Sequence, residues 1–310
     1  MRRVYASLPL SGPTASHGRD VLLGVQLALE RWTSVELVVL DSFGPDRDEV
    51  AVAHARRAAG DDSAVAYIGD FHSSQVLETA PILGDAGLLQ ITPVATYVGL
   101  GGPTLVRLMP NDAAGARAIA AWLDEMRVRS LLVVHDHDEG YGMPVGAMCV
   151  EAAAARGLAV RSGPVWDDPP ERADILEIEA VVYVGAGGAS VAPLWETLHL
   201  LDPTLWLVGT DGIAVPQLVR ELSPAAAERT RLFVANRAPF AFYGFEAMAL
   251  ALDSIAEGDG DREAVTRAAR ATRDRRSPLG TYSLDENGLT TMAEYGRLAV
   301  IGHELAWDVN

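Results

Sequence analysis

The chain has 310 residues, of which 49% are hydrophobic and 22% charged, a composition typical of a globular protein with enough apolar residues for two cores. Its formal net charge of −17 at pH 7 repels phosphate backbones and anionic lipid, which argues against nucleic acid as a partner and against non-specific binding to a membrane surface. Cys149 is the only cysteine, which excludes a disulfide framework and a cysteine-based zinc site.

Short apolar runs alternate with amphipathic segments along most of the chain. Several runs are continuous in Val, Leu and Ile, as in strands that are covered on both faces, and the alternation predicts an α/β fold with parallel sheets. The predicted strands are residues 4–8, 36–40, 64–69, 88–92, 131–135, 180–184, 205–209 and 231–235. The predicted helices are residues 19–31, 47–59, 74–86, 112–126, 141–156, 190–201 and 241–257.

The strand–helix alternation breaks in three places, at residues 101–111, around 232–239 and at 275–290. Three breaks indicate two lobes that are each assembled from separate parts of the chain and are joined by a three-strand hinge. In parallel sheets, ligands bind beyond the carboxyl ends of the strands, so the cleft between the lobes is the expected site. The predicted lobes are residues 1–108 with 238–279, and residues 109–237 with 280–310.

Polar side chains follow several of the predicted strands. Ser73 and Ser74 stand between a strand and a helix, where free backbone N–H groups and the helix dipole suit a carboxylate; plain helix capping is the alternative. Thr96 presents a hydroxyl after the next strand, unless it is only a turn residue. Asp211 lies in a Thr-Asp-Gly turn, where it either pairs with an ammonium group or simply forms the turn.

Residues 135–142, HDHDEGYG, look at first like a metal site because two histidines and three carboxylates fall within five positions. No distant set of cysteines or histidines completes a coordination sphere, and an acidic loop before a helix also suits the helix dipole. We therefore expect a solvated loop with no metal, in which Tyr141 is the functional residue.

Residues 185–190, GAGGAS, follow a strand and precede a helix, as a dinucleotide-binding motif does. Ser190 replaces the third glycine, which that motif needs for close packing of helix on strand, so nicotinamide binding is the weaker interpretation. The chain also has no nucleophile elbow, no phosphate-binding loop and no zinc-protease motif, and we expect neither catalysis nor a cofactor.

Four stretches together resemble the leucine/isoleucine/valine-binding family of type I periplasmic binding proteins. They are YASLPLSGPTASHGRDVLLGVQLALE, VAYIGDFHSSQVLETAPILGDAGLLQITPVATYVGL, LLVVHDHDEGYGMPVGAMCVEAAAARGLAV and PLGTYSLDENGL, and they extend over nearly the whole chain. The resemblance implies two Rossmann-like lobes, three hinge crossings and a small ligand trapped between the lobes.

The resemblance also implies which residues bind the ligand. In members that bind amino acids, the α-carboxylate and α-ammonium are recognised at the positions of Ser73, Thr96, Tyr141 and Asp211. Backbone groups near Phe71 and Val94 are expected to add contacts, and the candidates for contacting the ligand side chain are His17, Phe71, His72 and Tyr97. Residues 163–180 depart from the family because they are short for the usual strand–helix–strand segment.

The function that the resemblance implies is non-catalytic binding of a small amino acid or related zwitterion, with hinge closure and delivery to the permease of an ABC importer. The alternative is a regulator or receptor domain that senses an amino acid or amide. The start MRRVYASLPL lacks the apolar region of a signal peptide. We therefore expect an extracytoplasmic monomer if a signal was removed upstream, and a cytoplasmic sensor otherwise.

Overall fold

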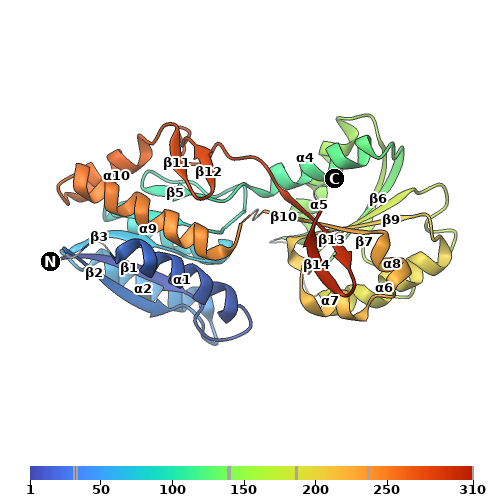
Figure 1. Ribbon diagram of the computed structural model, residues 1–310, viewed down its shortest axis with the longest axis horizontal. Helices are drawn as coiled ribbons and strands as arrows, with labels where there is room; N and C mark the ends of the chain where they lie inside the picture. The colour runs from blue at the N-terminus through green and yellow to red at the C-terminus, as the bar shows by residue number, and fades with distance from the viewer. Residues whose placement is uncertain (31, 33, 138–140, 186–187, 236–237, 309–310) are drawn as a thin grey trace. The chain divides into compact units, whose positions relative to one another are not determined.

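The computed structural model describes residues 1–310 except 31, 33, 138–140, 186–187, 236–237 and 309–310. The chain forms two compact units, each built from separate parts of the sequence (Figure 1). Unit 1 contains Met1–Asn111 and Asn236–Ala293, and unit 2 contains Asp112–Ala235 and Glu294–Asn310.

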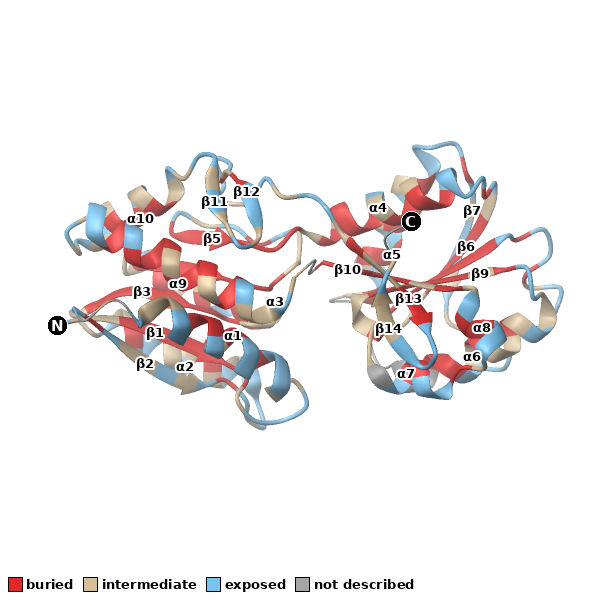
Figure 2. Ribbon diagram, in the orientation of Figure 1, coloured by how far each residue is buried: buried red, intermediate tan, exposed pale blue. Residues whose placement is uncertain are grey.

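Unit 1 is built on a five-stranded parallel sheet with the strand order β2-β1-β3-β4-β5. The central strand β3 is buried along its whole length, because its sequence AVAYI offers apolar side chains to both faces (Figure 2). The strands are β1 Arg2–Leu8, β2 Val35–Asp41, β3 Ala64–Ile68, β4 Leu89–Thr92 and β5 Leu105–Arg107.

Five helices and a small hairpin complete unit 1. They are α1 Ala15–Leu29, α2 Arg47–Ala59, α3 Ser73–Asp85, α9 Phe240–Glu257, α10 Arg262–Arg270, β11 Arg275–Ser277 and β12 Gly280–Tyr282. Helices α1 and α9 touch through glycines, since a Cβ on Gly24 would lie 1.8 Å from the Ala241 carbonyl oxygen and one on Gly244 would lie 1.9 Å from that of Val21. This close approach holds the start of α9 beside the start of α1.

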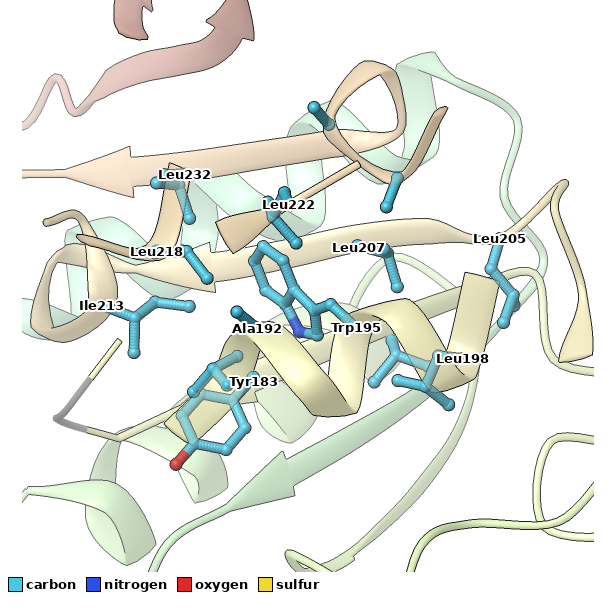
Figure 3. Packing of buried hydrophobic residues seen from close by; sticks show 14 of the residues in the cluster. Tyr183, Ala192, Trp195, Leu198, Leu205, Leu207, Ile213, Leu218, Leu222 and Leu232 are labelled. Atoms are coloured by element: carbon cyan, nitrogen blue, oxygen red, sulfur yellow. The ribbon is translucent and has the colours of Figure 1, made fainter. Parts of the chain in front are cut away.

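Unit 2 contains a seven-stranded sheet with the order β14-β13-β10-β9-β8-β6-β7. Trp195 is fully buried on one side of this sheet among side chains such as Leu207, Leu218 and Leu222 (Figure 3). The elements of unit 2 are α4 Asp112–Glu125, β6 Ser130–His135, α5 Gly142–Ala154, β7 Ala159–Pro164, β8 Ala180–Val184, α6 Gly188–Leu201, β9 Trp206–Thr210, a 3-10 turn Asp211–Ile213, α7 Pro216–Glu221, α8 Pro224–Glu228, β10 Thr230–Val234, β13 Gly296–Ile301 and β14 Glu304–Trp307.

The second sheet is mixed, whereas the sequence predicted parallel sheets throughout. Strands β6 to β10 are parallel, but β13 runs antiparallel to β10 and β14 antiparallel to β13. The two-residue turn between β13 and β14, in which Gly302 and His303 both have positive φ, at 57° and 67°, makes β14 antiparallel to β13. Turns of this kind reverse the chain into a tight hairpin.

The boundary of the last crossing differs from the predicted one. Residues 280–293 belong to unit 1 rather than to unit 2. Strand β12 pairs with β11, Tyr282 donates a hydrogen bond of 2.7 Å to Glu246 of α9, and Leu289 pairs with Arg107 at the end of β5. These bonds keep the segment on unit 1 until Ala293.

The shortening of residues 163–180 is visible in the structure. Residues 165–179, all of which are described, contain no helix and no strand between β7 and β8. Ile175 and Ile178 from this segment are nevertheless buried in the core that contains Trp195.

Among the helices of the described residues, none is both long and apolar enough to cross a membrane.

Candidate functional site

In unit 1, the predicted site residues gather beyond the carboxyl ends of β1, β3 and β4. The loop after β1 is fixed by Asp41 at the end of β2, whose carboxylate accepts hydrogen bonds from Leu10 N (2.8 Å), Phe43 N (3.1 Å) and the Ser11 hydroxyl (2.6 Å). Partial burial acts to raise the pKa of Asp41, but these hydrogen bonds outweigh it and lower that pKa. The loop leads directly into α1, which carries His17.

Ser73 begins α3, and its hydroxyl oxygen accepts a hydrogen bond of 3.3 Å from the backbone N–H of Tyr97. The helix cap is His72, not a serine, and Ser74 donates to Asp48 at 3.0 Å. Because Ser73 Oγ accepts this bond, its own hydroxyl proton can be donated to a ligand oxygen. Thr96 is half-buried in the same loop as Tyr97, and Val94 is buried just before it.

Three aromatic rings from distant parts of the sequence meet beside Ser73. His17 lies 4.8 Å from Phe240 and 6.5 Å from Phe71, and Phe71 lies 5.9 Å from Phe240, measured between ring centroids. His72 packs its ring edge-on against Phe71 at 5.2 Å. Tyr97 does not join this group through its ring, which packs against an apolar cluster that includes Val76 and Leu100.

Burial shifts the pKa values of two titratable groups at this end of the sheet in the direction that favours their uncharged forms. Burial, and then the nearby positive charge of Arg47, lower the pKa of His72 to about 4. Burial raises the pKa of Asp70 to about 6, although hydrogen bonds from Ser7, Thr79 and Tyr67 oppose the shift. Asp70 accepts hydrogen bonds of 2.9 Å from Thr79 and 3.1 Å from Tyr67, so a buried polar network supports the floor of the site.

In unit 2, Tyr141 and Asp211 are brought together although they are 70 residues apart. The Tyr141 hydroxyl donates a hydrogen bond of 2.6 Å to Asp211 Oδ1 and lies 3.0 Å from Thr210 Oγ1. Tyr141 precedes α5 at the carboxyl end of β6, and Asp211 follows β9 in a 3-10 turn. Both side chains are half-buried.

Burial perturbs both members of this pair. It raises the pKa of Asp211, while hydrogen bonds from Tyr141 and from the backbone N–H of Gly212 partly offset the shift. Burial, followed by the charge of Asp211, raises the pKa of Tyr141 well above its usual value, so the phenol keeps its proton and remains a donor. A half-buried carboxylate of this kind is stabilised by a cation that approaches its remaining lone pairs.

Glycines position the Asp211 turn. A Cβ on Gly212 would lie 2.2 Å from the Gly185 carbonyl oxygen and 3.1 Å from the Tyr141 ring, so the turn after β9 packs backbone to backbone against the end of β8. A Cβ on Gly185 would in turn lie 2.5 Å from Asp136 Oδ2. Side chains larger than hydrogen at these positions would displace Asp211.

The metal and dinucleotide interpretations receive no support from these residues. In the part of the chain that the structure describes, no group of three or more His, Cys, Asp or Glu side chains is placed to hold a metal ion. Asp138 and Glu139 of HDHDEGYG lie outside the described residues, as do residues 186–187 of GAGGAS.

The structure therefore assembles the predicted residues into two groups, one in each unit. His17, Phe71, His72 and Ser73 form the first, with Thr96 and Val94 in the adjoining loop. Tyr141 and Asp211 form the second. The sequence patterns did not identify Phe240, whose ring contacts His17 and Phe71, or Thr210, whose hydroxyl contacts Tyr141. Phe240 begins a helix more than 160 residues after Phe71, and no local signal links the two.

Comparison with known proteins identifies the family of this chain. The sequence profile of the family described as "Periplasmic binding protein" matches residues 6–175. An amino acid binding protein of Pseudomonas aeruginosa is 26% identical over 232 residues, which cover 68% of this chain and 60% of that protein's length.

Solved structures are similar over almost the whole chain. A leucine binding protein, LivK, from Thermotoga maritima has a TM-score of 0.81 at 21% identity, covering 100% of this chain and 98% of that one. An ABC transporter substrate-binding protein from Desulfitobacterium hafniense, in complex with Leu, has a TM-score of 0.81 at 15% identity and covers 99% of each chain. At 15–21% sequence identity, the similarity of these structures shows only that the fold is shared. Together with the profile match over more than half of the sequence, it establishes that this chain belongs to the periplasmic binding protein family.

Proposed function

We propose that this protein binds one amino acid zwitterion without transforming it, and that residues of both units hold the ligand. The observation that carries the proposal is the Tyr141–Asp211 hydrogen bond of 2.6 Å. It orients one carboxylate oxygen of a half-buried acid and leaves the acid's remaining lone pairs for an ammonium group. Charge-assisted hydrogen bonds of this type contribute roughly 1.5–3 kcal/mol each.

The carboxylate of the ligand is assigned to unit 1. The Ser73 hydroxyl donates to it, helped by Thr96 and by the free backbone N–H groups in the first turn of α3, which has no acidic residue there. The partial positive charge of a helix N-terminus favours an anion at this position. Backbone groups near Phe71 and Val94 supply further contacts.

The biological role that fits such a site is solute capture for transport. Because each unit holds one end of the zwitterion, ligand binding favours the conformation in which both ends are held, and closure follows as a population shift. The closed, extracytoplasmic monomer then delivers its ligand to the permease of an ABC importer. The amino-acid-binding relative in Pseudomonas aeruginosa supports this role.

The proposal is tested by thermal denaturation in the presence of each of the twenty L-amino acids. At least one should stabilise the wild type, by about 2.7 kcal/mol at one hundred times its Kd. Asp211→Asn should abolish the stabilisation, and Ser73→Ala should weaken binding about tenfold. Asp168→Asn, an exposed aspartate of unit 2, is the matched control and should bind as the wild type does. Unchanged binding by Asp211→Asn would refute the proposed ammonium site.

A further inference from the structure

We infer that the rings of His17, Phe71 and Phe240 form a side-chain platform that selects amino acids with an aromatic side chain over those with an aliphatic one. The inference rests on the proposed function and specifies its ligand class. It concerns unit 1 alone, because all three rings belong to that unit.

The platform lies where the side chain of an amino acid held by Ser73 must go. Phe71 precedes Ser73 by two residues in the turn between β3 and α3. His17 and Phe240 come from the first turns of α1 and α9, and the glycine contacts between these two helices fix them beside each other. The ring positions are therefore set by the backbone rather than by flexible side chains.

The rings are incompletely covered by the rest of unit 1. His17 is exposed, and Phe71 and Phe240 are half-buried, whereas β3 and the last five residues of β1 are buried. Exposed aromatic surface beside convergent polar groups is typical of a ligand site. A ligand side chain that covers these rings removes apolar area from water on both partners.

The ring orientations favour an aromatic ligand. The planes of His17 and Phe71 are inclined by only 11°, whereas Phe240 is inclined by 46° to His17 and by 55° to Phe71. A ligand ring stacked in parallel on His17 or Phe71 takes one of the arrangements that aromatic pairs prefer, and it also meets the tilted ring of Phe240. An aliphatic side chain gains area from the same contacts but no ring stacking.

The ring of His72, which contacts the platform, also offers no charge to a ligand side chain. His72, which contacts Phe71, has its pKa lowered to about 4 by burial and by Arg47, so it is neutral at pH 7. Neither a cation nor an anion on the ligand finds a charged partner in that ring. The platform thus favours a neutral, planar side chain.

The test is isothermal titration calorimetry with L-phenylalanine, L-tyrosine, L-leucine and L-valine. The wild type should bind the aromatic amino acids about three- to tenfold more tightly than the aliphatic ones, as expected for one or two ring pairs. Phe71→Leu and Phe240→Leu should each remove most of this preference. Phe242→Leu is the matched control, because Phe242 lies on the same helix, is 44% exposed and is not part of the ring cluster.

The outcomes separate this inference from the proposed function. Tighter binding of leucine or valine than of phenylalanine by the wild type would overturn the aromatic platform and leave amino-acid binding intact. If no amino acid bound at all, both the aromatic platform and the proposed amino-acid binding would be refuted. The comparison of ligands on the wild type needs no variant, so it decides the matter even if a substitution impairs folding.

Discussion

At the scale of single residues, the most consequential feature is that two acidic side chains are withdrawn from water and accept hydrogen bonds from neighbouring hydroxyl groups. Asp211 accepts a hydrogen bond from Tyr141, and Asp70 accepts hydrogen bonds from Thr79 and Tyr67. In each case burial raises the pKa of the carboxyl group, and the donors partly offset that rise. The first acid faces the proposed ligand, while the second supports the turn that carries Phe71 and Ser73.

Asp70 predicts a defined pH dependence of stability. Its pKa is raised to about 6 in the folded protein from an ordinary value of 3.8, so the folded state binds this proton more tightly than the unfolded chain does. The resulting stability is fully present below pH 3.8 and is lost as the pH rises through about 6, on the order of 3 kcal/mol in total.

Urea denaturation of the wild type and of Asp70→Asn between pH 4 and 7 measures this contribution of Asp70 to the free energy of unfolding. The free energy of unfolding of the wild type should fall relative to that of the variant across this range, because asparagine does not titrate. Asp20→Asn, an exposed aspartate on α1, serves as the control and should follow the wild type. Parallel pH profiles for wild type and Asp70→Asn would contradict the assignment.

Sequence position nominated several candidate site residues but not their partners. Ser73, Thr96, Tyr141 and Asp211 all follow strands, and that order along the chain is enough to nominate them. The Tyr141–Asp211 bond and the contact of Phe71 with Phe240 join residues 70 or more positions apart. No local pattern encodes such distances, so these contacts emerge only from the packed structure.

At the scale of elements, the turn after β9 is tightly constrained by its neighbours. Gly212 packs against the Gly185 carbonyl and the Tyr141 ring, so the turn has no room for a side chain. Such constraint fixes Asp211 without requiring a long hydrogen-bond network. Substrate-positioning groups held by backbone packing tolerate little displacement.

Gly212→Ala should therefore weaken ligand binding at least tenfold. The added methyl group would lie 2.2 Å from the Gly185 oxygen, so the turn must shift and Asp211 must move relative to Tyr141. The same overpacking should lower the free energy of unfolding by about 1–3 kcal/mol. Titration calorimetry and urea denaturation measure the two effects.

Gly163→Ala is the control for this prediction, since a Cβ at Gly163 has no heavy atom within 4 Å. It should change neither affinity nor stability appreciably. If Gly212→Ala bound ligand as tightly as Gly163→Ala, backbone packing would not be what positions Asp211.

The elements themselves were predictable wherever the sequence carries a continuous apolar run or a long amphipathic period. All eight predicted strands and all seven predicted helices are confirmed, although α1 begins four residues earlier than predicted. Strand β7 was missed because it is an edge strand whose sequence AVRSGP is largely exposed and has no apolar run. The exceptions are helix α10 and strand β13, which were missed although they carry an amphipathic period and the apolar run LAVI. The short helices α7 and α8 and strand β14 gave no comparable signal.

At the scale of the whole chain, the sequence indicated two units with three crossings, and the structure contains two compact units that divide near two of the expected places. The third division lies after Ala293 instead of after residue 279, because the Tyr282–Glu246 bond and the pairing of Leu289 with Arg107 are long-range contacts. The family profile and the solved structures agree with the two-unit α/β fold.

The central claim is that both charged ends of an amino acid are recognised, one by each unit. Its most direct test is titration calorimetry with three ligands: the L-amino acid that stabilises the wild type most, the same molecule without its amino group, and the same molecule without its carboxylate. Each deletion removes charge-assisted hydrogen bonds and should weaken binding by about tenfold to one hundredfold. Binding of either analogue as tightly as the amino acid itself would contradict the account.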